Sequence, residues 1–324
     1  MSKIEWTDVT WNPIVGCTRV SEGCRHCYAE RMAKRLQAMG NENYADTVDK
    51  HGRWTGRVNL VPDALEKPLH WRKPRRIFVC SMSDLFHESV PDKFIAAIFS
   101  IMLQAQTHTF QVLTKRPKRM HEWISRCGDK DGLGWITHDA TPPQIPFRGT
   151  GIIVGNDDNW PLPNVHLGVS VENQATANER IPWLLQAPAA VHWISLEPML
   201  GPVDLWDLIT DRDRVPIIDG VVVGGESGPG ARPMHPDWVR SVRDQCQEAG
   251  VAFFFKQWGA WAPYSPLWEE TLCRRRLYQN VLDMGCGGGT VGMWRVGKKA
   301  AGRVLDRRTW GEWPGDAAQE TERE

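Results

Sequence analysis

Apolar and polar positions alternate along the chain in a way that predicts strands and helices in turn. Short, almost wholly apolar runs recur, and segments with apolar residues at helical spacing follow most of them. The predicted strands cover residues 11–17, 77–84, 110–116, 165–172, 191–197, 217–226 and 251–256. Strands that alternate with amphipathic helices are typical of a parallel α/β fold. Six or seven such repeats favour a partial or full (β/α) barrel over a doubly wound sheet.

Each predicted helix is expected to bury one face. The first helix ends at Gly40, and its inward face is expected to consist of Tyr28, Met32, Leu36 and Met39. Pro91 opens a second helix, whose apolar face consists of Phe94, Ile95, Ile98, Phe99 and Met102. Further helices are predicted over residues 117–126, 173–186 and 236–249.

Two stretches interrupt this rhythm, and a third ends it. Residues 41–75 are polar and broken by Gly and Pro, which predicts a long irregular connection. Residues 127–163 are rich in Gly, Pro, Asp and Asn, which predicts an insertion that serves as a lid or an extra loop. The chain from residue 258 onward is loop-rich. We therefore expect a barrel domain over 1–257 and a C-terminal extension over 258–324 that packs on the barrel.

Polar side chains stand at the carboxyl end of every predicted strand. They are Cys17; Ser81, Ser83 and Asp84; Thr114, Lys115 and Arg116; Ser170 and Glu172; Glu197; Glu226 and Ser227; Lys256 and Gln257. In a barrel these strand ends share one rim, which is where active sites lie. Solvation explains one polar strand end, but seven in succession indicate a functional site.

Composition narrows the class of protein. The 324 residues are 41% hydrophobic, which allows a sizeable core, and 39 Lys and Arg balance 39 Asp and Glu. A net charge of zero argues against a broad, sequence-independent nucleic-acid surface but leaves room for a local basic patch. The N-terminus has no apolar signal-peptide core, and no apolar run reaches 18 residues. We therefore expect a cytoplasmic protein with no membrane partner.

Three of the eight cysteines, Cys17, Cys24 and Cys27, fall at C-x6-C-x2-C spacing just before the first helix. In a reducing compartment, clustered cysteines are metal ligands more often than disulfides. Three thiolates without a close fourth favour an iron–sulfur cluster with one open iron, because a closed structural zinc site needs four ligands. His26 and Cys80 are the candidate fourth ligands for zinc. A zinc-stabilised nucleic-acid-binding protein without catalysis is therefore the alternative. The scattered cysteines Cys80, Cys127, Cys246, Cys273 and Cys286 are otherwise expected to be buried or idle thiols.

A three-cysteine site at the top of the first strand of a (β/α) barrel resembles the radical S-adenosylmethionine superfamily, whose usual spacing is C-x3-C-x2-C. A closer resemblance extends over nearly the whole chain. Its segments are, in order, WTDVTWNP, GCTRVSEGCRHCYA, SMSDLFH, LTKRP, GVSVEN, SLEPM, GGESG, ARPM, FFKQWG and GKKAAGRVLD. Together they resemble a radical-SAM-like family borne by bacteriophages and prophages, which has no settled function.

The resemblance implies a role for each group of residues on the rim. The cluster ligands are Cys17, Cys24 and Cys27, and S-adenosylmethionine would chelate the open iron of a [4Fe–4S] cluster. The residues that match the place where the superfamily meets the methionine amino group are Ser81, Ser83 and Asp84. Ser170 and Glu172 match a region that contacts ribose or carboxylate, and His26 stands near adenine. Adenine or substrate would lie by Glu197 and the turn Gly224, Gly225, Glu226 and Ser227.

The candidate catalytic residues on the same rim are Lys115, Arg116, Glu197 and Lys256. The cations of this set, with Arg232, can bind phosphate or carboxylate. Structural roles are the alternative: a solvated strand end for Lys115 and Arg116, a turn cap for Glu197, and a tight turn for Gly224 and Gly225.

The implied activity is reductive cleavage of S-adenosylmethionine to a 5′-deoxyadenosyl radical, which abstracts hydrogen from a substrate. Aminocarboxypropyl transfer by the same cluster is a variant that the sequence leaves open. The implied protein partner is a reductase or a flavodoxin-type electron donor. The favoured substrate is a nucleobase or nucleotide, with phage DNA in a bacterial host as its source and nucleic acid as a partner. A base in duplex DNA would have to be flipped out, whereas a free nucleotide or amino-acid-like metabolite fits the neutral charge equally well.

One glycine-rich stretch invites a different interpretation. Residues 281–290, VLDMGCGGGT, resemble the first motif of Rossmann-type methyltransferases. That motif requires a helix and then a strand that ends in an acidic residue, whereas VGMWRVGKKAAGR follows here. We therefore expect a flexible segment of the tail rather than a methyltransferase domain.

Overall fold

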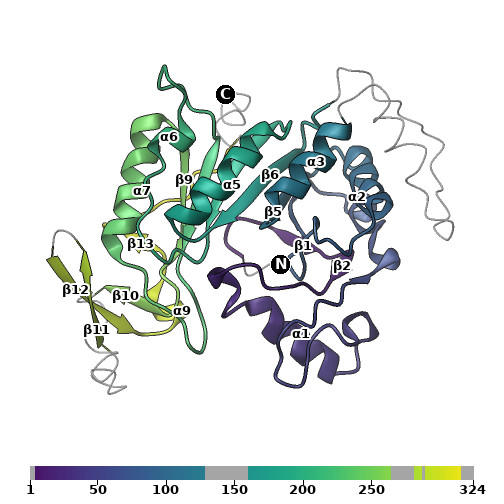
Figure 1. The fold of residues 1–324 in the computed structure, drawn as a ribbon, viewed down its shortest axis with the longest axis horizontal. Coiled ribbons are helices and arrows are strands. Elements are labelled where there is room, and N and C mark those ends of the chain that lie inside the picture. The colour runs from purple at the N-terminus through teal and green to yellow at the C-terminus, as the bar shows by residue number, and fades with distance from the viewer. Residues whose placement is uncertain (1–3, 128–159, 264–280, 287–288, 315–324) are drawn as a thin grey trace. The chain divides into compact units, whose positions relative to one another are not determined.

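The main element of the protein is a sheet of seven parallel strands, seen in a computed structural model that describes residues 4–127, 160–263, 281–286 and 289–314 (Figure 1). The order in the sheet is β1-β4-β5-β6-β7-β8-β9. These strands are β1 (Val9–Trp11), β4 (Arg76–Val79), β5 (Thr109–Thr114), β6 (Val165–Val171), β7 (Val191–Leu196), β8 (Gly220–Gly224) and β9 (Ala252–Gln257). The order follows the sequence, and β1 and β9 are the two edges of the described sheet. The predicted α/β fold is therefore confirmed in its open form, a partial (β/α) barrel.

The chain divides into two compact units. Unit 1 comprises Met1–Val20, Ala29–Val169 and Arg180–His192, and unit 2 comprises Ser21–Tyr28, Ser170–Glu179 and Trp193–Glu324. The barrel domain over 1–257 and the extension over 258–324 stay a prediction from the sequence.

Unit 1 buries its strands under two helices whose apolar faces agree with the sequence pattern. Helix α2 (Asp92–Gln104) buries the predicted face from Phe94 to Met102. Helix α3 (Pro117–Cys127) buries Met120, Trp123 and Ile124. The ring centroids of Phe99 and Trp123 lie 4.8 Å apart, so the two helices share one aromatic core.

In unit 2, helix α7 (Pro236–Ala249) follows β8. The His235 side chain accepts a hydrogen bond from the Asp237 amide at its N-terminus, and Gly250, with a φ of 72°, ends the helix in the left-handed region. The remaining α-helices in the described part of the chain are α5 (Gln174–Gln186), α6 (Trp206–Ile209) and α9 (Lys298–Ala301).

The tail of unit 2 lies along β9. The Phe255 amide donates to the Trp310 carbonyl at 3.1 Å, and Phe254 bridges Gly311 in antiparallel fashion. The smaller strands of the tail are β10 (Trp261–Pro263), β11 (Val281–Cys286), β12 (Gly289–Arg295), β13 (Val304–Leu305) and β14 (Arg308–Thr309). The tail therefore covers an edge that would otherwise expose unpaired backbone groups.

The prediction of one strand over residues 11–17 is wrong. The structure has β1, then a break at Asn12 and Pro13, then β2 (Ile14–Val15), which pairs with β3 (Asn59–Leu60). Pro13 has no amide hydrogen to donate to a ladder. The side-chain oxygen of Asn12 instead accepts hydrogen bonds from the Ser81 hydroxyl and the Met82 amide, both at 3.1 Å. The break thus ties the cysteine strand to the turn after β4.

The predicted inward face of the first helix is also wrong. In α1 (Tyr28–Ala38), Tyr28 and Met32 are 47% and 44% exposed, and Met39 just beyond the helix is 69% exposed. The buried residues of α1 are Ala29, Glu30 and Ala33. The helix packs through this small face, where the Glu30 carboxylate accepts hydrogen bonds from the Arg19 guanidinium and the Trp54 amide.

In the glycine-rich stretch near the end, β11 and β12 pair as antiparallel strands, and the flexibility expected of this stretch stays a prediction. A strand followed by an antiparallel strand lacks the helix that a methyltransferase motif needs. The predicted insertion over 127–163 lies almost wholly outside the described residues, so its use as a lid stays a prediction. In the described part of the chain, no helix combines the length and apolar character needed to span a bilayer.

Candidate functional site

Cys17 lies in unit 1, beside the turn that follows β4. The Gly16 amide donates to the Met82 carbonyl at 3.1 Å, and Gly16 bridges Ser83. Gly16 has a φ of 94°, and a Cβ there would collide with the Arg57 carbonyl oxygen. Only glycine fits this conformation and this space, so the sequence fixes where the next residue, Cys17, is presented.

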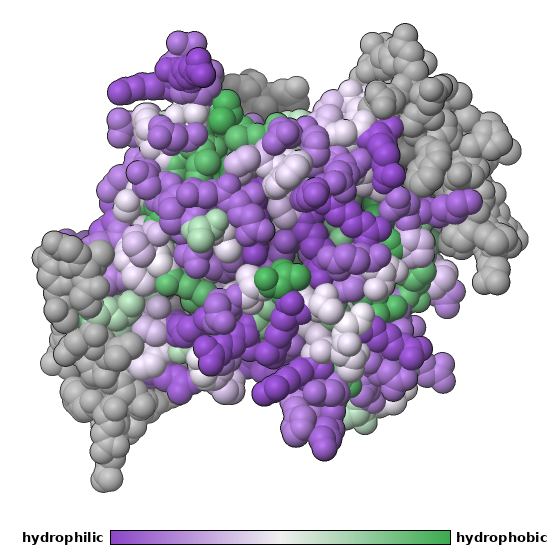
Figure 2. Space-filling model, viewed as in Figure 1, coloured by the Kyte–Doolittle hydropathy of each residue, from purple (hydrophilic) through white to green (hydrophobic). Residues whose placement is uncertain are grey.

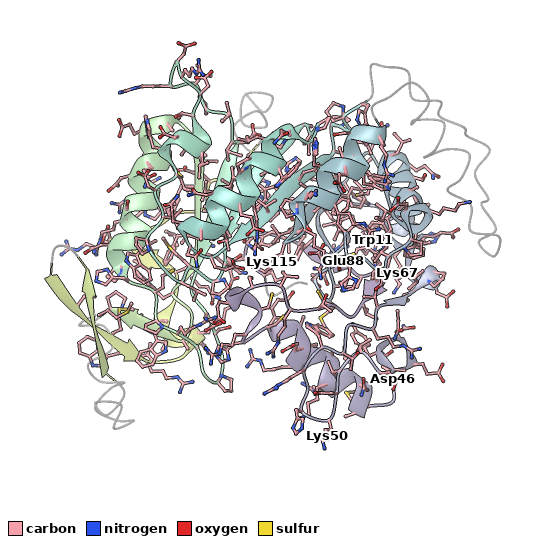
Figure 3. All side chains as sticks on the ribbon, viewed as in Figure 1. Trp11, Asp46, Lys50, Lys67, Glu88 and Lys115 are labelled. Carbon is pink, nitrogen blue, oxygen red and sulfur yellow. The ribbon has the colours of Figure 1, made fainter. Side chains whose placement is uncertain are left out.

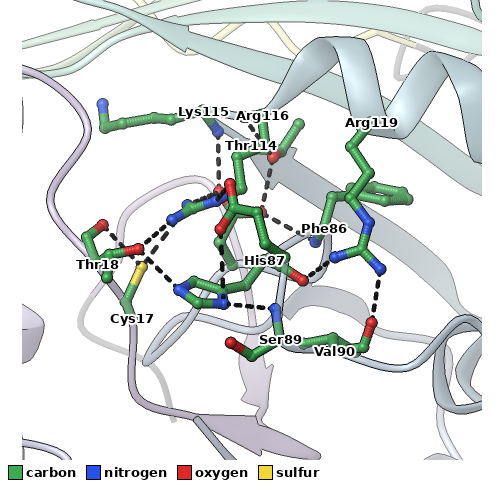
Figure 4. A network of polar contacts seen from close by, with 12 residues as sticks. Cys17, Thr18, Phe86, His87, Ser89, Val90, Thr114, Lys115, Arg116 and Arg119 are labelled. Carbon is green, nitrogen blue, oxygen red and sulfur yellow. Dashed lines mark hydrogen bonds and ion pairs between the residues drawn. The ribbon is translucent and has the colours of Figure 1, made fainter. Parts of the chain in front are cut away.

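Arg116 brings the predicted strand ends of unit 1 together around Cys17 (Figure 4). Its Nη1 lies 3.9 Å from Cys17 Sγ and 3.1 Å from an Asp84 carboxylate oxygen. Its Nε donates to Glu88 at 2.8 Å and its Nη2 to the Thr18 hydroxyl at 2.6 Å. The predicted solvated strand end is therefore wrong for Arg116, whose side chain is only 6% exposed.

Charge explains why a guanidinium is stable in this buried place. Burial by itself lowers the pKa of Arg116, but the negative charges of Asp84 and Cys17 outweigh it, so the pKa is raised above its ordinary value. The adjacent His87 ring interacts with the Thr18 hydroxyl at 2.8 Å, and burial and Arg116 lower its pKa. A neutral imidazole beside a permanent cation keeps the positive charge of this network on Arg116.

Ser81, Ser83 and Asp84 serve as structural supports in unit 1. The Ser83 hydroxyl donates to the Ile14 carbonyl at 2.9 Å, which ties it to the cysteine strand. Asp84 accepts hydrogen bonds from the Thr114 hydroxyl at 2.7 Å and the Lys115 amide at 3.0 Å. Their predicted contact with a methionine amino group stays a prediction. The Lys115 side chain is half-buried (Figure 3).

Cys24 and Cys27 lie in unit 2, in a loop that two carboxylates hold. The Ser21 hydroxyl donates to Glu172 Oε1 at 2.7 Å, and Glu172 is 1% exposed. Gly23 lies so close that a Cβ there would stand 2.7 Å from Glu172 Cδ. Glu172, at the end of β6, therefore supports the loop that carries Cys24 and Cys27. The sequence did not predict this contact.

A second anchor of this loop is the ion pair between Glu226 and Arg232. Arg232 donates to Glu226 through Nε at 3.0 Å and Nη2 at 2.8 Å, a bidentate pair. The same guanidinium donates to the Glu22 carbonyl at 2.9 Å and to the Glu22 carboxylate at 3.3 Å. His26 packs against the same segment, because a Cβ at Gly230 would lie 2.8 Å from its Cε1.

Glu197 and Lys256, two predicted catalytic residues, form an ion pair at 2.7 Å in unit 2. The Ser195 hydroxyl donates to the other Glu197 oxygen at 3.3 Å. A Cβ at Gly224 would stand 2.5 Å from Glu197 Oε1, and a Cβ at Gly225 would collide with the Trp258 carbonyl. Close packing therefore requires the glycine pair, a reason that differs from the tight turn offered as the alternative in the sequence analysis.

The remaining predicted residues of unit 2 lie in or just after β6, β8 and β9. Ser170 is buried in β6, and Ser227 is half-buried after β8. Gln257 is 6% exposed, and its Oε1 has no hydrogen-bond partner among the described residues. A buried acceptor without a partner is costly, so this amide is a candidate for contact with a bound molecule.

The sequence did not predict five polar residues of the contact networks around the predicted site residues. They are Thr18, Ser21, Glu22, His87 and Glu88. All five are polar residues within or beside the segments that carry the family resemblance. Their position in those motifs was the available signal, but their partners are distant in sequence.

The thiols differ in a way that agrees with a ligand role for the motif. Cys24, Cys80 and Cys246 are buried, whereas Cys17 and Cys27 are half-buried. Burial raises the pKa of Cys80 to about 12, and burial also raises that of Cys246. Both thiols are buried, as predicted, and the candidate role of Cys80 as a fourth zinc ligand stays a prediction.

Three soft thiols fit a thiolate-bound iron–sulfur group by donor chemistry, and in unit 1 Arg116 adds a cation beside Cys17. Cys17 belongs to unit 1, and Cys24 and Cys27 belong to unit 2. Among the described residues, no set of three His, Cys, Asp or Glu side chains is placed to hold a metal ion.

Comparison with known proteins places the chain in a family. No curated protein matches it. A solved structure of a spore photoproduct lyase double mutant, with bound AdoMet and dinucleoside spore photoproduct, is similar at 10% identity with a TM-score of 0.34. That similarity covers 97% of this chain and 71% of the other. Residues 1–314 match one family model, in agreement with the expected resemblance over nearly the whole chain. The chain therefore belongs to the family described as "Protein of unknown function (DUF5131)".

Proposed function

We propose that this protein is a radical S-adenosylmethionine enzyme that acts on a nucleobase or nucleotide. The observation that carries the proposal is the way each half of the cysteine motif is held. In unit 1, Cys17 lies beside Arg116 and the turn after β4. In unit 2, the loop of Cys24 and Cys27 rests on Glu172 and on the pair of Glu226 with Arg232. Buried charges at the carboxyl ends of parallel strands are typical of active sites in this class of fold.

Three residues, Cys17, Cys24 and Cys27, would hold a [4Fe–4S] cluster. When bound, such a group would supply one electron to S-adenosylmethionine, whose 5′ carbon–sulfur bond would break to give methionine and a 5′-deoxyadenosyl radical that takes a hydrogen atom from the substrate. The chain's part is to orient the thiols through Ser21 and Glu172 and to neutralise negative charge through Arg116. Glu197, Lys256 and Gln257, the last of which follows Lys256 directly in the sequence, offer hydrogen-bond donors and acceptors to the edge of a heterocyclic base.

Metal analysis tests the proposal. Protein purified without oxygen should carry about four irons and four acid-labile sulfides per chain. Cys24→Ala should abolish this loading, whereas Cys80→Ala, the matched control at an idle thiol, should retain it. One zinc and no iron would overturn the proposal in favour of a zinc-stabilised nucleic-acid-binding protein.

The bond that is cleaved is tested by product analysis. Incubation with S-adenosylmethionine and a strong reductant should yield 5′-deoxyadenosine and methionine. Methylthioadenosine in their place would indicate aminocarboxypropyl transfer. Mass spectrometry of nucleosides from phage DNA, made with and without the protein, should reveal a changed base if DNA is the substrate.

A further inference from the structure

The segment between β2 and β4 is basic although the whole chain is neutral. Residues 29–76 carry eleven Lys and Arg against six Asp and Glu, a formal charge of +5, while the whole chain has a formal charge of zero. The excess is on unit 1, in the segment that begins with α1. A local charge of this size in a neutral protein calls for a partner of opposite sign.

Loop 48–54 lies lengthwise along α1 and joins its cations to those of the helix. Gln37 pairs with the Val48 backbone, donating from Nε2 at 3.2 Å and accepting at Oε1 at 3.4 Å. The Trp54 amide donates to Glu30 Oε1 at 3.0 Å. Between these ends, a Cβ at Gly52 would lie 2.7 Å from Cδ of Lys34, so the lysine stem rests on the loop.

The carboxylates of this surface are occupied by internal contacts. Glu30 is 4% exposed and accepts both guanidinium donors of Arg19, at 2.8 and 2.5 Å. Asp49 accepts the His51 and Arg53 amides at 2.8 and 2.9 Å, and the hydrogen bond from Arg53 lowers its pKa. Glu30 therefore ties the loop to the helix from a buried position, whereas the exposed Asp49 carboxylate shapes the loop itself.

The cations of the same surface face solvent. Lys34, Arg35, Lys50 and Arg53 are all exposed, and within the described chain Lys34, Arg35 and Lys50 form no ion pair. Figure 3 places Lys50 at the outer end of this segment, and the corresponding edge of the surface in Figure 2 is strongly hydrophilic. We call Lys34, Arg35, Lys50 and Arg53 the basic surface.

We propose that the basic surface binds the phosphodiester backbone of a nucleic acid, so that the substrate base reaches the enzyme within a polynucleotide. The second clause rests on the proposed function, while the binding itself does not. Exposed, unpaired Lys and Arg side chains release condensed counterions when they meet phosphates, and this entropy drives sequence-independent binding. Lys34 and Arg35 adjoin on a helix of 11 residues, and the loop adds two cations beside them.

Salt dependence tests this inference with the full, cluster-loaded chain. The probes are a fluorescein-labelled single-stranded DNA and its duplex, followed by anisotropy between about 50 and 200 mM KCl. Four phosphate contacts predict a slope of log K against log salt of about −3.6 for the duplex and about −2.8 for the single strand. The arm with the tighter binding identifies which form is presented.

Charge removal localises the contact. The variant K34Q/R35Q/K50Q/R53Q should lose most of the salt dependence and bind DNA at least about tenfold more weakly at low salt. The matched control K298Q/K299Q removes two exposed lysines of unit 2 and should bind as the wild type does. Equal loss in both variants, or a wild-type slope near zero, would overturn the inference. So would displacement of the DNA by polyglutamate as effectively as by unlabelled DNA, because the surface would then suit an acidic protein.

The two proposals fail separately. Both variants should form 5′-deoxyadenosine from S-adenosylmethionine at the wild-type rate without substrate, because none of the substituted residues is assigned to the cluster or to S-adenosylmethionine. DNA binding with no S-adenosylmethionine cleavage would refute the proposed function and leave the nucleic-acid partner standing. Cleavage with no DNA binding would refute the inference alone.

Discussion

Nη1 of Arg116 lies 3.9 Å from Sγ of Cys17, and the same guanidinium is paired with the buried carboxylate of Asp84. A permanent cation at this distance stabilises negative charge on the sulfur. Reduction of an iron–sulfur cluster adds one negative charge, so hydrogen bonds and cations near its thiolates raise its reduction potential. Arg116 therefore has a role beyond packing if Cys17 is a ligand.

Arg116→Gln should lower the reduction potential of the loaded cluster by roughly 60 mV, a tenfold change for a one-electron couple. Arg116→Lys keeps the charge, and its reduction potential should lie between those of the wild type and Arg116→Gln. The measurement is a redox titration followed by electron paramagnetic resonance. Arg126→Gln, which removes an exposed guanidinium paired with Asp92, is the control and should leave the potential unchanged. An unchanged potential in Arg116→Gln would remove the proposed tuning role.

The pair of Asp84 and Arg116 should also show in the free energy of unfolding. Their side chains are 8% and 6% exposed, so Arg116→Gln leaves a buried carboxylate without its cation and should cost about 3–5 kcal/mol. The double variant D84N/R116Q should cost less than the sum of the two single variants. Urea unfolding of the four proteins measures the coupling, and additive losses would mean that the pair is not coupled.

A substitution at Gly23 tests the close contact between the cysteine loop and Glu172. A Cβ at Gly23 would stand 2.7 Å from Cδ of buried Glu172, so Gly23→Ala must displace either the loop or the carboxylate. We expect iron per chain to fall to less than roughly half of the wild-type value, since misplaced thiols cost metal affinity. Gly201→Ala is the matched control, because its Cβ would meet only Asn173 Cβ at 3.7 Å. Normal loading of Gly23→Ala would show that the loop tolerates movement.

His166 should make the fold sensitive to acid. Burial, and after it the charge of Arg76, lowers the pKa of His166 from 6.5 to about 4. Between these values the unfolded chain binds a proton that the folded chain does not. The contribution is therefore fully present above about pH 6.5 and is lost as the pH falls towards 4, a loss of roughly 3 kcal/mol.

The measurement is the free energy of urea unfolding from pH 7 to pH 4. His166→Gln should lose less stability over this range than the wild type, while the exposed control His70→Gln should follow the wild type. Parallel curves for the wild type and His166→Gln would mean that the His166 ring is not shielded from solvent.

Local patterns predicted the parts of the fold that depend on local spacing. The positions of the strands after the first and the buried faces of α2 and α3 follow from periodicity, because Phe94 and Met120 meet the core through their own helix geometry. The prediction for the buried face of α1 was wrong because the packing of this helix depends on contacts with residues outside it. Glu30 is buried by Arg19 and by the Trp54 backbone, which are distant in sequence and leave no trace in the helical pattern.

The site shows the same division. Polar residues at strand ends were predicted because the end of a buried strand is visible in the sequence. Which of them contact one another was not, since the pairs of Arg116 with Asp84 and of Ser21 with Glu172 join residues 32 and 151 positions apart. Glycine roles were likewise ambiguous, because Gly224 permits a turn in the sequence but in three dimensions makes room for Glu197.

The ion pair of Lys256 and Glu197 should act as one unit. Its atoms are 2.7 Å apart and the side chains are 15% and 16% exposed, so removing either partner leaves a poorly solvated charge beside Gly224. Lys256→Met and Glu197→Gln should each lower the rate of 5′-deoxyadenosine formation about tenfold or more, and K256M/E197Q should be no slower than the worse single variant. Lys256→Arg should recover part of the rate, which a purely steric role would not explain. Multiplicative losses in the double variant would mean that the two residues act independently, with Lys256 binding an anionic group and Glu197 serving a separate step.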